Sequence, residues 1–148
     1  MTWRLSLDPE ERLEDQLTDR LVEHNQSASE AFPLRFEEDN LRARAVQAYA
    51  TDEAGRLIGG CTGNTVEIWQ WLTVDTMWVD SSRRRQGIGR TLLDAVEDQA
   101  RARNCRWAKL NTWEFQAPDF YQRLGYVVYG RELDYPPGHI NYLMRKDL

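Results

Sequence analysis

The segment that most constrains the fold joins a strand-like run to an amphipathic helix through a short turn. Residues 72–79 are rich in β-branched and aromatic side chains, which is typical of a strand. Residues 87–104 repeat apolar side chains at helical spacing, which predicts one buried face. That face consists of Leu92, Leu93, Val96 and Ala100. A strand, a tight turn and a helix in this order indicate a domain in which helices pack on a sheet.

The turn between these two elements concentrates positive charge in a chain whose formal net charge is -5. Its arginines are Arg83, Arg84, Arg85 and Arg90, and its glycines are Gly87 and Gly89. Free backbone N–H groups and the dipole at the start of a helix attract anions, and glycine lets a phosphate approach the backbone closely. The turn therefore predicts an anion site. The competing interpretation is that the glycines only permit a tight turn and that the arginines are solvated.

Three other kinds of anion-binding site fit this turn poorly: a dinucleotide-binding loop, a P-loop and a nucleic-acid-binding surface. A dinucleotide fingerprint needs a third glycine where the chain has Leu92, and a P-loop needs a lysine that does not follow either glycine. A nucleic-acid binder is disfavoured because 24 acidic residues outnumber 19 basic ones and no aromatic residue interleaves the arginines. No apolar run is long enough to span a bilayer, and no secretory leader is expected, so we expect a cytoplasmic protein.

The rest of the chain predicts one mixed α/β domain over residues 1–148. Asp8 is the expected N-cap of the first helix, and Leu13, Leu17 and Leu21 its buried stripe. Cys61 and Cys105 match no metal-ligand spacing and are interpreted as buried thiols, so no metal is expected. Residues 26–40 show no clear periodicity, and the turn within 63–69 is left open. The expected elements are strands at 1–7, 42–51, 57–61, 72–79, 106–112, 126–131 and 140–146, and helices at 8–25, 87–104 and 117–124.

Two motifs, in the expected order, resemble the GNAT superfamily of acetyl-CoA-dependent N-acetyltransferases. Residues 84–89, Arg-Arg-Gln-Gly-Ile-Gly, fit the [QR]-x-x-G-x-[GA] pyrophosphate loop, and residues 77–80 look like the end of the strand before it. Residues 116–126 resemble the A-x-x-x-Y-x-x-x-G-[FY] segment that carries the family's catalytic tyrosine. The resemblance covers residues 42–146 well and the first 40 residues only by element order.

The resemblance implies a central, mostly antiparallel sheet that is splayed between strands 4 and 5, with helices on both faces. It also implies that the pantetheine arm of coenzyme A lies in that gap and that acetyl-CoA is the co-substrate. The backbone of Trp78 and Val79 would meet the arm, and Gln116 and Phe120 are further candidate contacts. The residues implied to cradle the pyrophosphate are Arg84, Arg85, Gln86, Gly87, Ile88, Gly89, Arg90 and Thr91.

The implied reaction is direct attack of an amine on the thioester, through a tetrahedral intermediate. Tyr121 matches the family's acid for the leaving thiolate, Asp75 is the candidate base through water, and the N–H of Val79 is the candidate oxyanion donor. Glu67 is a second candidate base. The alternatives are that Tyr121 is a core aromatic residue and Asp75 a structural one. One departure is Glu114, which stands where many members have a coenzyme-binding asparagine.

The acceptor is expected to be a primary amine of a small molecule. The regions expected to contact it are residues 1–40, 67–71 and 135–139. A wall of Trp69, Trp71, Trp113 and Tyr135 and the acidic residues Glu37, Glu38 and Asp39 would suit a flat or cationic molecule. A protein N-terminus or lysine, and a non-catalytic acyl-CoA-binding module, stay open as alternatives. A homodimer is an option for the assembly.

Overall fold

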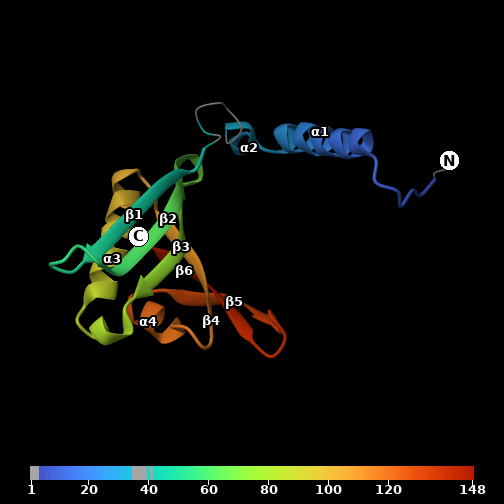
Figure 1. Cartoon of the computed structure of the whole chain (residues 1–148). Helices are drawn as coiled ribbons and strands as arrows, with labels where there is room; N and C mark the ends of the chain where they lie inside the picture. The colour runs from blue at the N-terminus through green and yellow to red at the C-terminus, as the bar shows by residue number, and fades with distance from the viewer. Residues whose placement is uncertain (1–3, 35–39, 41) are drawn as a thin grey trace. The chain divides into compact units, whose positions relative to one another are not determined.

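The computed structural model describes residues 4–34, 40 and 42–148 (Figure 1). The chain divides into two compact units, Met1–Leu41 and Arg42–Leu148, which are described separately. The acidic residues Glu37, Glu38 and Asp39 lie outside the described residues. The expectation that residues 1–148 form one domain stays a prediction.

The first unit contains the helices α1 (Glu11–Ala28) and α2 (Ala31–Leu34). The N-cap of α1 lies two residues later than the sequence predicts: Glu10 occupies this position and Asp8 does not cap the helix. The expected strand at 1–7 is wrong for its described part, because residues 4–7 are not in a strand. Their leucines, Leu5 and Leu7, are exposed, and a strand needs a paired neighbour to satisfy its backbone.

The leucine stripe of α1 is exposed, which contradicts its predicted burial. No residue of α1 is buried, and Leu13, Leu17 and Leu21 all present their side chains to solvent. The periodicity correctly indicated a helix with one apolar face. It gave no information on a partner for that face.

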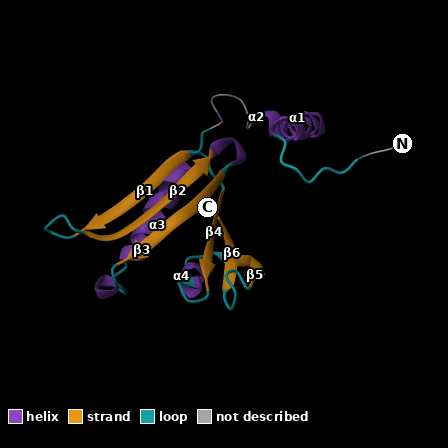
Figure 2. Cartoon of the chain, turned by 45° about the vertical axis from the view of Figure 1, so that its right-hand side comes forward, coloured by secondary structure: helices purple, strands orange, loops and turns teal. Residues whose placement is uncertain are grey.

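The second unit is a six-stranded sheet in the order β1-β2-β3-β4-β6-β5 (Figure 2). All neighbouring strands are antiparallel except β3 and β4, which are parallel. The mixed, mostly antiparallel sheet predicted from the sequence is confirmed. The strands are β1 (Arg44–Thr51), β2 (Leu57–Val66), β3 (Trp71–Val79), β4 (Trp107–Trp113), β5 (Val127–Leu133) and β6 (Ile140–Asp147).

Two helices of this unit, α3 (Ile88–Ala102) and α4 (Pro118–Arg123), cover one face of the sheet. The four apolar residues predicted for the buried face of α3 are buried. The helices also touch each other, because a Cβ on Gly89 of α3 would lie 3.2 Å from the Phe120 ring of α4. The opposite face is called the open face below. The expected helix cover of that face stays a prediction.

The sheet splits between β3 and β4, as the sequence analysis predicts. Their ladder has only three residue pairs, which join Trp71–Thr73 to Trp107–Lys109, and the two strands then diverge (Figure 2). The β2–β3 register also shifts between Thr62 and Gly63, which leaves Asp75 as the extra residue of a β-bulge. A Cβ on Gly63 would lie 2.3 Å from the carbonyl oxygen of Thr73, so glycine permits the close approach of the strands here.

Two turns complete the first half of the sheet. Asp52 closes the predicted β1–β2 turn by accepting hydrogen bonds from the N–H groups of Ala54 and Arg56, both 2.9 Å. The turn that the sequence left open is a short 3-10 helix, Glu67–Trp69, which ends at Gln70 with a φ of 59°.

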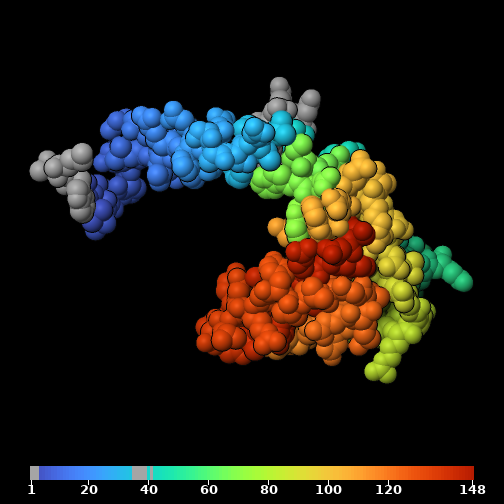
Figure 3. Space-filling view, turned by 180° about the vertical axis from the view of Figure 1, so that it is seen from behind, coloured from blue at the N-terminus to red at the C-terminus, as the bar shows by residue number. Residues whose placement is uncertain are grey.

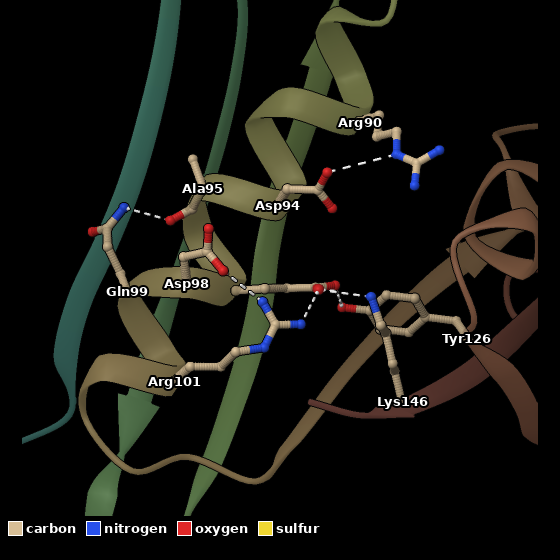
Figure 4. A network of polar contacts seen from close by, with 9 residues as sticks. Arg90, Asp94, Ala95, Asp98, Gln99, Arg101, Tyr126 and Lys146 are labelled. Carbon is tan, nitrogen blue, oxygen red and sulfur yellow. Dashed lines mark hydrogen bonds and ion pairs between the residues drawn. The ribbon is translucent and has the colours of Figure 1, made fainter.

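A buried carboxylate ties α3 to the far half of the sheet through Tyr126 and Lys146, which are labelled in Figure 4. Glu97 is fully buried and accepts a hydrogen bond from the Tyr126 hydroxyl at 3.0 Å. It also accepts hydrogen bonds from Lys146 at 2.7 Å and Arg101 at 3.1 Å. Figure 3 shows α3, in yellow, beside the red β6.

Among the described residues, no helix is both long and apolar enough to cross a membrane.

Candidate functional site

The strand β3 leads into a loop that is fixed at its first residue. The Oδ1 atom of Asp80 accepts hydrogen bonds from the Ser82 N–H at 2.8 Å and the Ser82 hydroxyl at 2.6 Å. The Asp80 N–H in turn donates to the Ile58 carbonyl of the neighbouring chain segment. The hydrogen bonds from Ser82 hold the pKa of Asp80 below its ordinary value. The loop that follows projects from the surface as the yellow-green segment before α3 in Figure 3.

The backbone N–H groups of residues 84–90 make no hydrogen bond to the described residues. The first backbone bond at the start of α3 runs from the Thr91 N–H to the Gly87 carbonyl, at 3.0 Å. Arg85 and Gly87 adopt left-handed conformations, with φ of 62° and 81°. Alternation of left- and right-handed residues gathers successive N–H groups into a concave anion-binding nest. The loop therefore presents a row of free donors at the N-terminus of α3.

The arginine side chains of this loop are partly engaged within the protein. The Arg84 Nε donates to the Val79 carbonyl at 3.3 Å, and Arg90 lies 3.6 Å from the Asp94 carboxylate. Among the described residues, Arg83 and Arg85 have no ion pair. The predicted set is thus brought together in the loop and the first turn of α3. Its last member differs, because the N–H of Thr91 is already used by the helix.

Gly89 is required by packing as well as by the loop. A Cβ at this position would lie 3.2 Å from Phe120 and 3.3 Å from Met77, which brings α3, α4 and β3 into contact. Phe120 is therefore a packing residue at the junction of these elements. Gln116 fixes the turn before α4, because its Oε1 accepts hydrogen bonds from the Thr112 hydroxyl and the Trp113 N–H, both 3.1 Å.

The free edge of β3 faces the split in the sheet. Asp80 donates to Ile58, so residues 80 and 58 form a hydrogen-bonded pair in the antiparallel ladder. Because such pairs alternate, the N–H groups of Val79 and Met77 point away from β2 and toward the split. The Val79 N–H thus lies on the edge where the sequence analysis expects an oxyanion donor. Trp78, beside it, is exposed.

Tyr121 is almost buried, with 7% of its surface exposed, on the face covered by α3 and α4. Its ring packs edge-to-face against Phe120 at 5.2 Å and Tyr126 at 5.8 Å. The hydroxyl makes no hydrogen bond to the described residues, in which no fully buried side-chain polar atom lacks a partner. It is therefore not sealed from solvent. Burial, with a smaller effect of Cys61, raises the pKa of Tyr121 to about 12.

The two candidate bases lie in different places. Asp75, at the bulge of β3, is exposed and accepts a hydrogen bond from the side-chain amide of Asn64. Asn64 is on the open face, so Asp75 and Tyr121 lie on opposite faces of the sheet. Glu67 directly follows β2, three residues after Asn64, and is paired with Arg44 at 2.9 Å. It forms no ion pair or hydrogen bond with Asp75 among the described residues. Sequence reasoning missed Asn64, because nothing in its neighbourhood indicates a pairing across the bulge.

Glu114, the departure from the family motif, forms a pair with His139. Its Oε1 atom lies 2.6 Å from the His139 Nδ1. Its Oε2 atom accepts a hydrogen bond from the Ile140 N–H at 2.8 Å. The hydrogen bond to His139 is the main reason why the pKa of Glu114 lies below its ordinary value. Phe115 is exposed and packs edge-on against the same imidazole at 5.0 Å. The pair fastens the loop before β6 to the end of β4.

The predicted aromatic wall is wrong as a single surface, because its members form two groups. Trp69 and Trp71 line a hollow on the open face. Trp113 lies at the other end of β4, where its Nε1 donates to the Tyr135 carbonyl at 2.6 Å. A strand rises about 3.3 Å per residue, which separates Trp107 from Trp113 by roughly 20 Å. Sequence spacing could not place these residues on one or two surfaces.

The cysteines are unsuited to nucleophilic chemistry. Cys61 and Cys105 are both buried free thiols. Burial raises the pKa of Cys61 to about 12, and it also raises the pKa of Cys105. Because the thiolate is the reactive form, neither is a ready nucleophile. Among the described residues, no group of His, Cys, Asp and Glu side chains could hold a metal ion.

The family assignment follows from a match over more than half of the chain. Residues 10–126 match the model of the acetyltransferase (GNAT) family, and this range includes the loop 84–90 and Tyr121. The chain is a GNAT acetyltransferase. Enzymes of this family use acetyl-CoA as the acetyl donor.

Similar proteins agree with this assignment to the GNAT family. The chain is 43% identical over 112 residues to blasticidin-S acetyltransferase of Streptomyces morookaense, covering 73% of this chain and 81% of the relative. It is 31% identical over 117 residues to an acetyltransferase of Agrobacterium fabrum, covering 79% and 77%. A crystal structure of an acetyltransferase from Bacillus cereus superposes with a TM-score of 0.74, at 29% identity and 98% coverage of both chains.

Proposed function

We propose that this GNAT enzyme transfers the acetyl group of acetyl-CoA to a primary amine of a small molecule. The observation that carries the proposal is the row of free N–H groups at residues 84–90, next to the split between β3 and β4. A diphosphate needs several donors at a fixed place, and the split offers an unpaired strand edge for an extended arm. A small-molecule acceptor is supported by the name of the relative with 43% identity, blasticidin-S acetyltransferase.

The nest and the strand edge would hold the coenzyme. The N–H groups of residues 84–90 donate to the diphosphate, and Arg83 and Arg85 add positive charge around it. The free N–H groups of Met77 and Val79 face the arm. When bound, acetyl-CoA supplies an acetyl group that is already activated, so the protein has to position the acceptor, stabilise charge and move protons.

Tyr121 is suited to protonate the leaving sulfur. A pKa of about 12 keeps the phenol protonated at neutral pH, so it acts as an acid and not as a base. The Val79 N–H points into the split, where it can donate to an oxygen that gains negative charge in the reaction. Tyr121 lies on the side of α3 and α4, and the acceptor amine approaches from the open face.

Asp75 is the residue that we assign to take the proton from the incoming ammonium, through water. Its carboxylate is exposed on the open face and is oriented by the amide of Asn64. A base on the face opposite Tyr121 keeps the two proton transfers apart, one at the nitrogen and one at the sulfur. This arrangement requires no covalent enzyme intermediate, in agreement with two cysteines that are buried and protonated.

The test is turnover of acetyl-CoA with a panel of small primary amines and of peptides with free N-termini and lysines, measured as released thiol. We expect turnover on small amines. Replacing Tyr121 with Phe is expected to lower kcat by roughly 10²- to 10³-fold with little change in KM for acetyl-CoA, because only the acid is removed. Tyr49→Phe, on β1 and exposed, is the matched control.

Each alternative has its own outcome in this assay. Turnover confined to peptides would favour a protein acceptor and contradict the small-molecule proposal. Tight acetyl-CoA binding without turnover on any amine would favour a non-catalytic module. Equal kcat for the Tyr121→Phe variant and the unmodified enzyme would remove Tyr121 from the mechanism.

A further inference from the structure

The open face carries a hollow of about 460 Å³ that the proposed reaction does not use. Five strands, β2 to β6, and the turn before β3 meet around it. Its residues alternate with buried ones: Trp71 and Thr73 flank the buried Leu72. The hollow therefore lies on the face opposite Tyr121. Its lining residues are Val66, Trp69, Trp71, Thr73, Lys109, Tyr129 and Arg145.

The floor of the hollow combines an aromatic face with two cations. The Lys109 Nζ lies 5.8 Å, and the Arg145 Cζ 5.6 Å, from the centre of the Trp71 ring. The Trp107 ring packs against the Trp71 ring at 5.5 Å but does not itself line the hollow. A flat, apolar ring system can stack on such a floor, and the volume is within the range of small-molecule sites.

The charge of the hollow is opposite to that of the chain as a whole. Its lining contains two cations and no carboxylate, whereas the chain has a net charge of -5. Lys109 forms no ion pair with the described residues, and Arg145 contacts Asp147 at 3.0 Å, outside the lining. The complementary ligand is thus planar and negatively charged. A cationic ring would be repelled by both side chains.

The hollow lies next to the part of β3 where the reaction is proposed to take place. Thr73 is both a lining residue and the last residue of β3 that pairs with β4, so the hollow adjoins the start of the split. Asp75 follows two residues later and is also on the open face. From Thr73 to Val79 the strand advances roughly 20 Å. A molecule that fills the hollow and reaches the reacting edge of β3 must be elongated.

We infer that the hollow binds the planar, anionic end of the acceptor, and that the acceptor is an elongated amine with an aromatic carboxylate or a similar group at its far end. This inference rests on the proposed function, because it concerns the acceptor of the same reaction. Lys109 and Arg145 select the negative charge, and Trp71 and Tyr129 select the planar shape.

The substrate test compares two amines that are long enough to span this distance and differ only in one carboxylate, 4-(10-aminodecyl)benzoate and 10-phenyldecylamine. We expect a KM about tenfold lower for the carboxylate, equivalent to one charge-assisted contact. Lys109→Met should remove most of this preference while leaving the KM for acetyl-CoA unchanged, and Lys109→Arg should retain it. Arg106→Met is the matched control, because Arg106 lies over Trp107 at 5.0 Å but does not line the hollow.

A binding test separates this inference from the proposed reaction. Calorimetric titration with 2-naphthoate, which carries no amine, should show saturable binding that weakens about tenfold in Lys109→Met and is unchanged in Arg106→Met. If 2-naphthoate binds in this way but no amine is acetylated, the hollow stands as a planar-anion site and the proposed function fails. If 2-naphthoate does not bind, or both amines react with equal KM, the inference is overturned.

Discussion

At the scale of single residues, Tyr121 stands out because the residue is nearly buried while its hydroxyl reaches solvent and has no partner among the described residues. The hydrogen-bonding capacity of this hydroxyl is not used by the protein, so it is a candidate for contact with a ligand. Its aromatic contacts with Phe120 and Tyr126 fix the ring without using the oxygen. The sequence motif predicted the residue, and the structure adds the reason why it keeps its proton.

The pKa of Tyr121 leads to a prediction about the pH dependence of kcat. In the proposed role the residue acts in its neutral form, and this form is lost only when the pH rises through about 12. We therefore expect no alkaline decline of kcat below about pH 11 that depends on Tyr121. The measurement is a pH–rate profile of the unmodified enzyme and the Tyr121→Phe variant. A decline near pH 9 that disappears in the variant would contradict the assignment.

At the scale of elements, the bulge of β3 determines where the sheet opens. One extra residue at Asp75 moves the following side chains to the other face, so Met77 and Val79 join the side of Leu72 and Val74. This places Met77 against Gly89 of α3 and leaves the β3 edge free. The bulge depends on the close approach of Gly63 and Thr73.

Gly63→Ala tests this dependence. The new Cβ would lie 2.3 Å from the Thr73 carbonyl oxygen, so the backbone must move. We expect a loss of about 1–3 kcal/mol in the free energy of unfolding, measured by denaturant titration. Gly60→Ala is the control on the same strand, because its Cβ would meet mainly the exposed Tyr49 ring at 3.2 Å and should cost less. Equal losses for the two variants would argue against the bulge as the strained point.

Elements with strong periodicity were predicted best, and irregular ones worst. The buried face of α3 was predicted residue by residue, because Leu92, Val96 and Ala100 recur at helical spacing on a face that packs on the sheet. The same pattern in α1 predicted a helix and failed on burial. The bulge at Asp75 was invisible, because one additional residue in a strand does not change its composition. Likewise, His139 could be matched to Glu114 only after β4 and β6 were paired.

At the scale of the whole molecule, stability depends on contacts between segments that are distant in the chain. Glu97 of α3 meets Lys146 of β6 and Tyr126 before β5, so one carboxylate connects the two halves of the split sheet (Figure 4). A buried charge is tolerated when it is paired and fully hydrogen-bonded. Its removal leaves the partners without compensation.

Glu97→Gln is expected to destabilise the fold by about 3 kcal/mol, measured by denaturant titration, because it leaves the cation of Lys146 largely buried without its carboxylate. Asp98→Asn is the matched control. Asp98 contacts the same Arg101 at 2.7 Å but is mostly exposed, and surface pairs contribute less than about 1 kcal/mol. A similar loss in both variants would show that burial of Glu97 is not the cause.

The loss of stability at acidic pH also concerns the whole molecule. Hydrogen bonds lower the pKa of Asp52, Asp80 and Glu114 in the folded state. Such groups stabilise the fold above their ordinary values of 3.8 and 4.5, and this stabilisation is lost as the pH falls through the lowered values. We expect Tm to decline below about pH 4.5, and Glu114→Gln to make the decline shallower. An unchanged slope in this variant would contradict the role of the Glu114–His139 pair.

The three-pair ladder between β3 and β4 has a consequence for protein engineering. Each half of the sheet is contiguous in sequence, and α3 packs on the first half, so a cut near Asn104 would separate two fragments that each retain their own strand pairing. The two fragments share one apolar core, the short ladder and the Glu97 carboxylate, so they should reassemble when held close together. Fused to two interacting proteins, they would report that interaction as restored acetyl transfer.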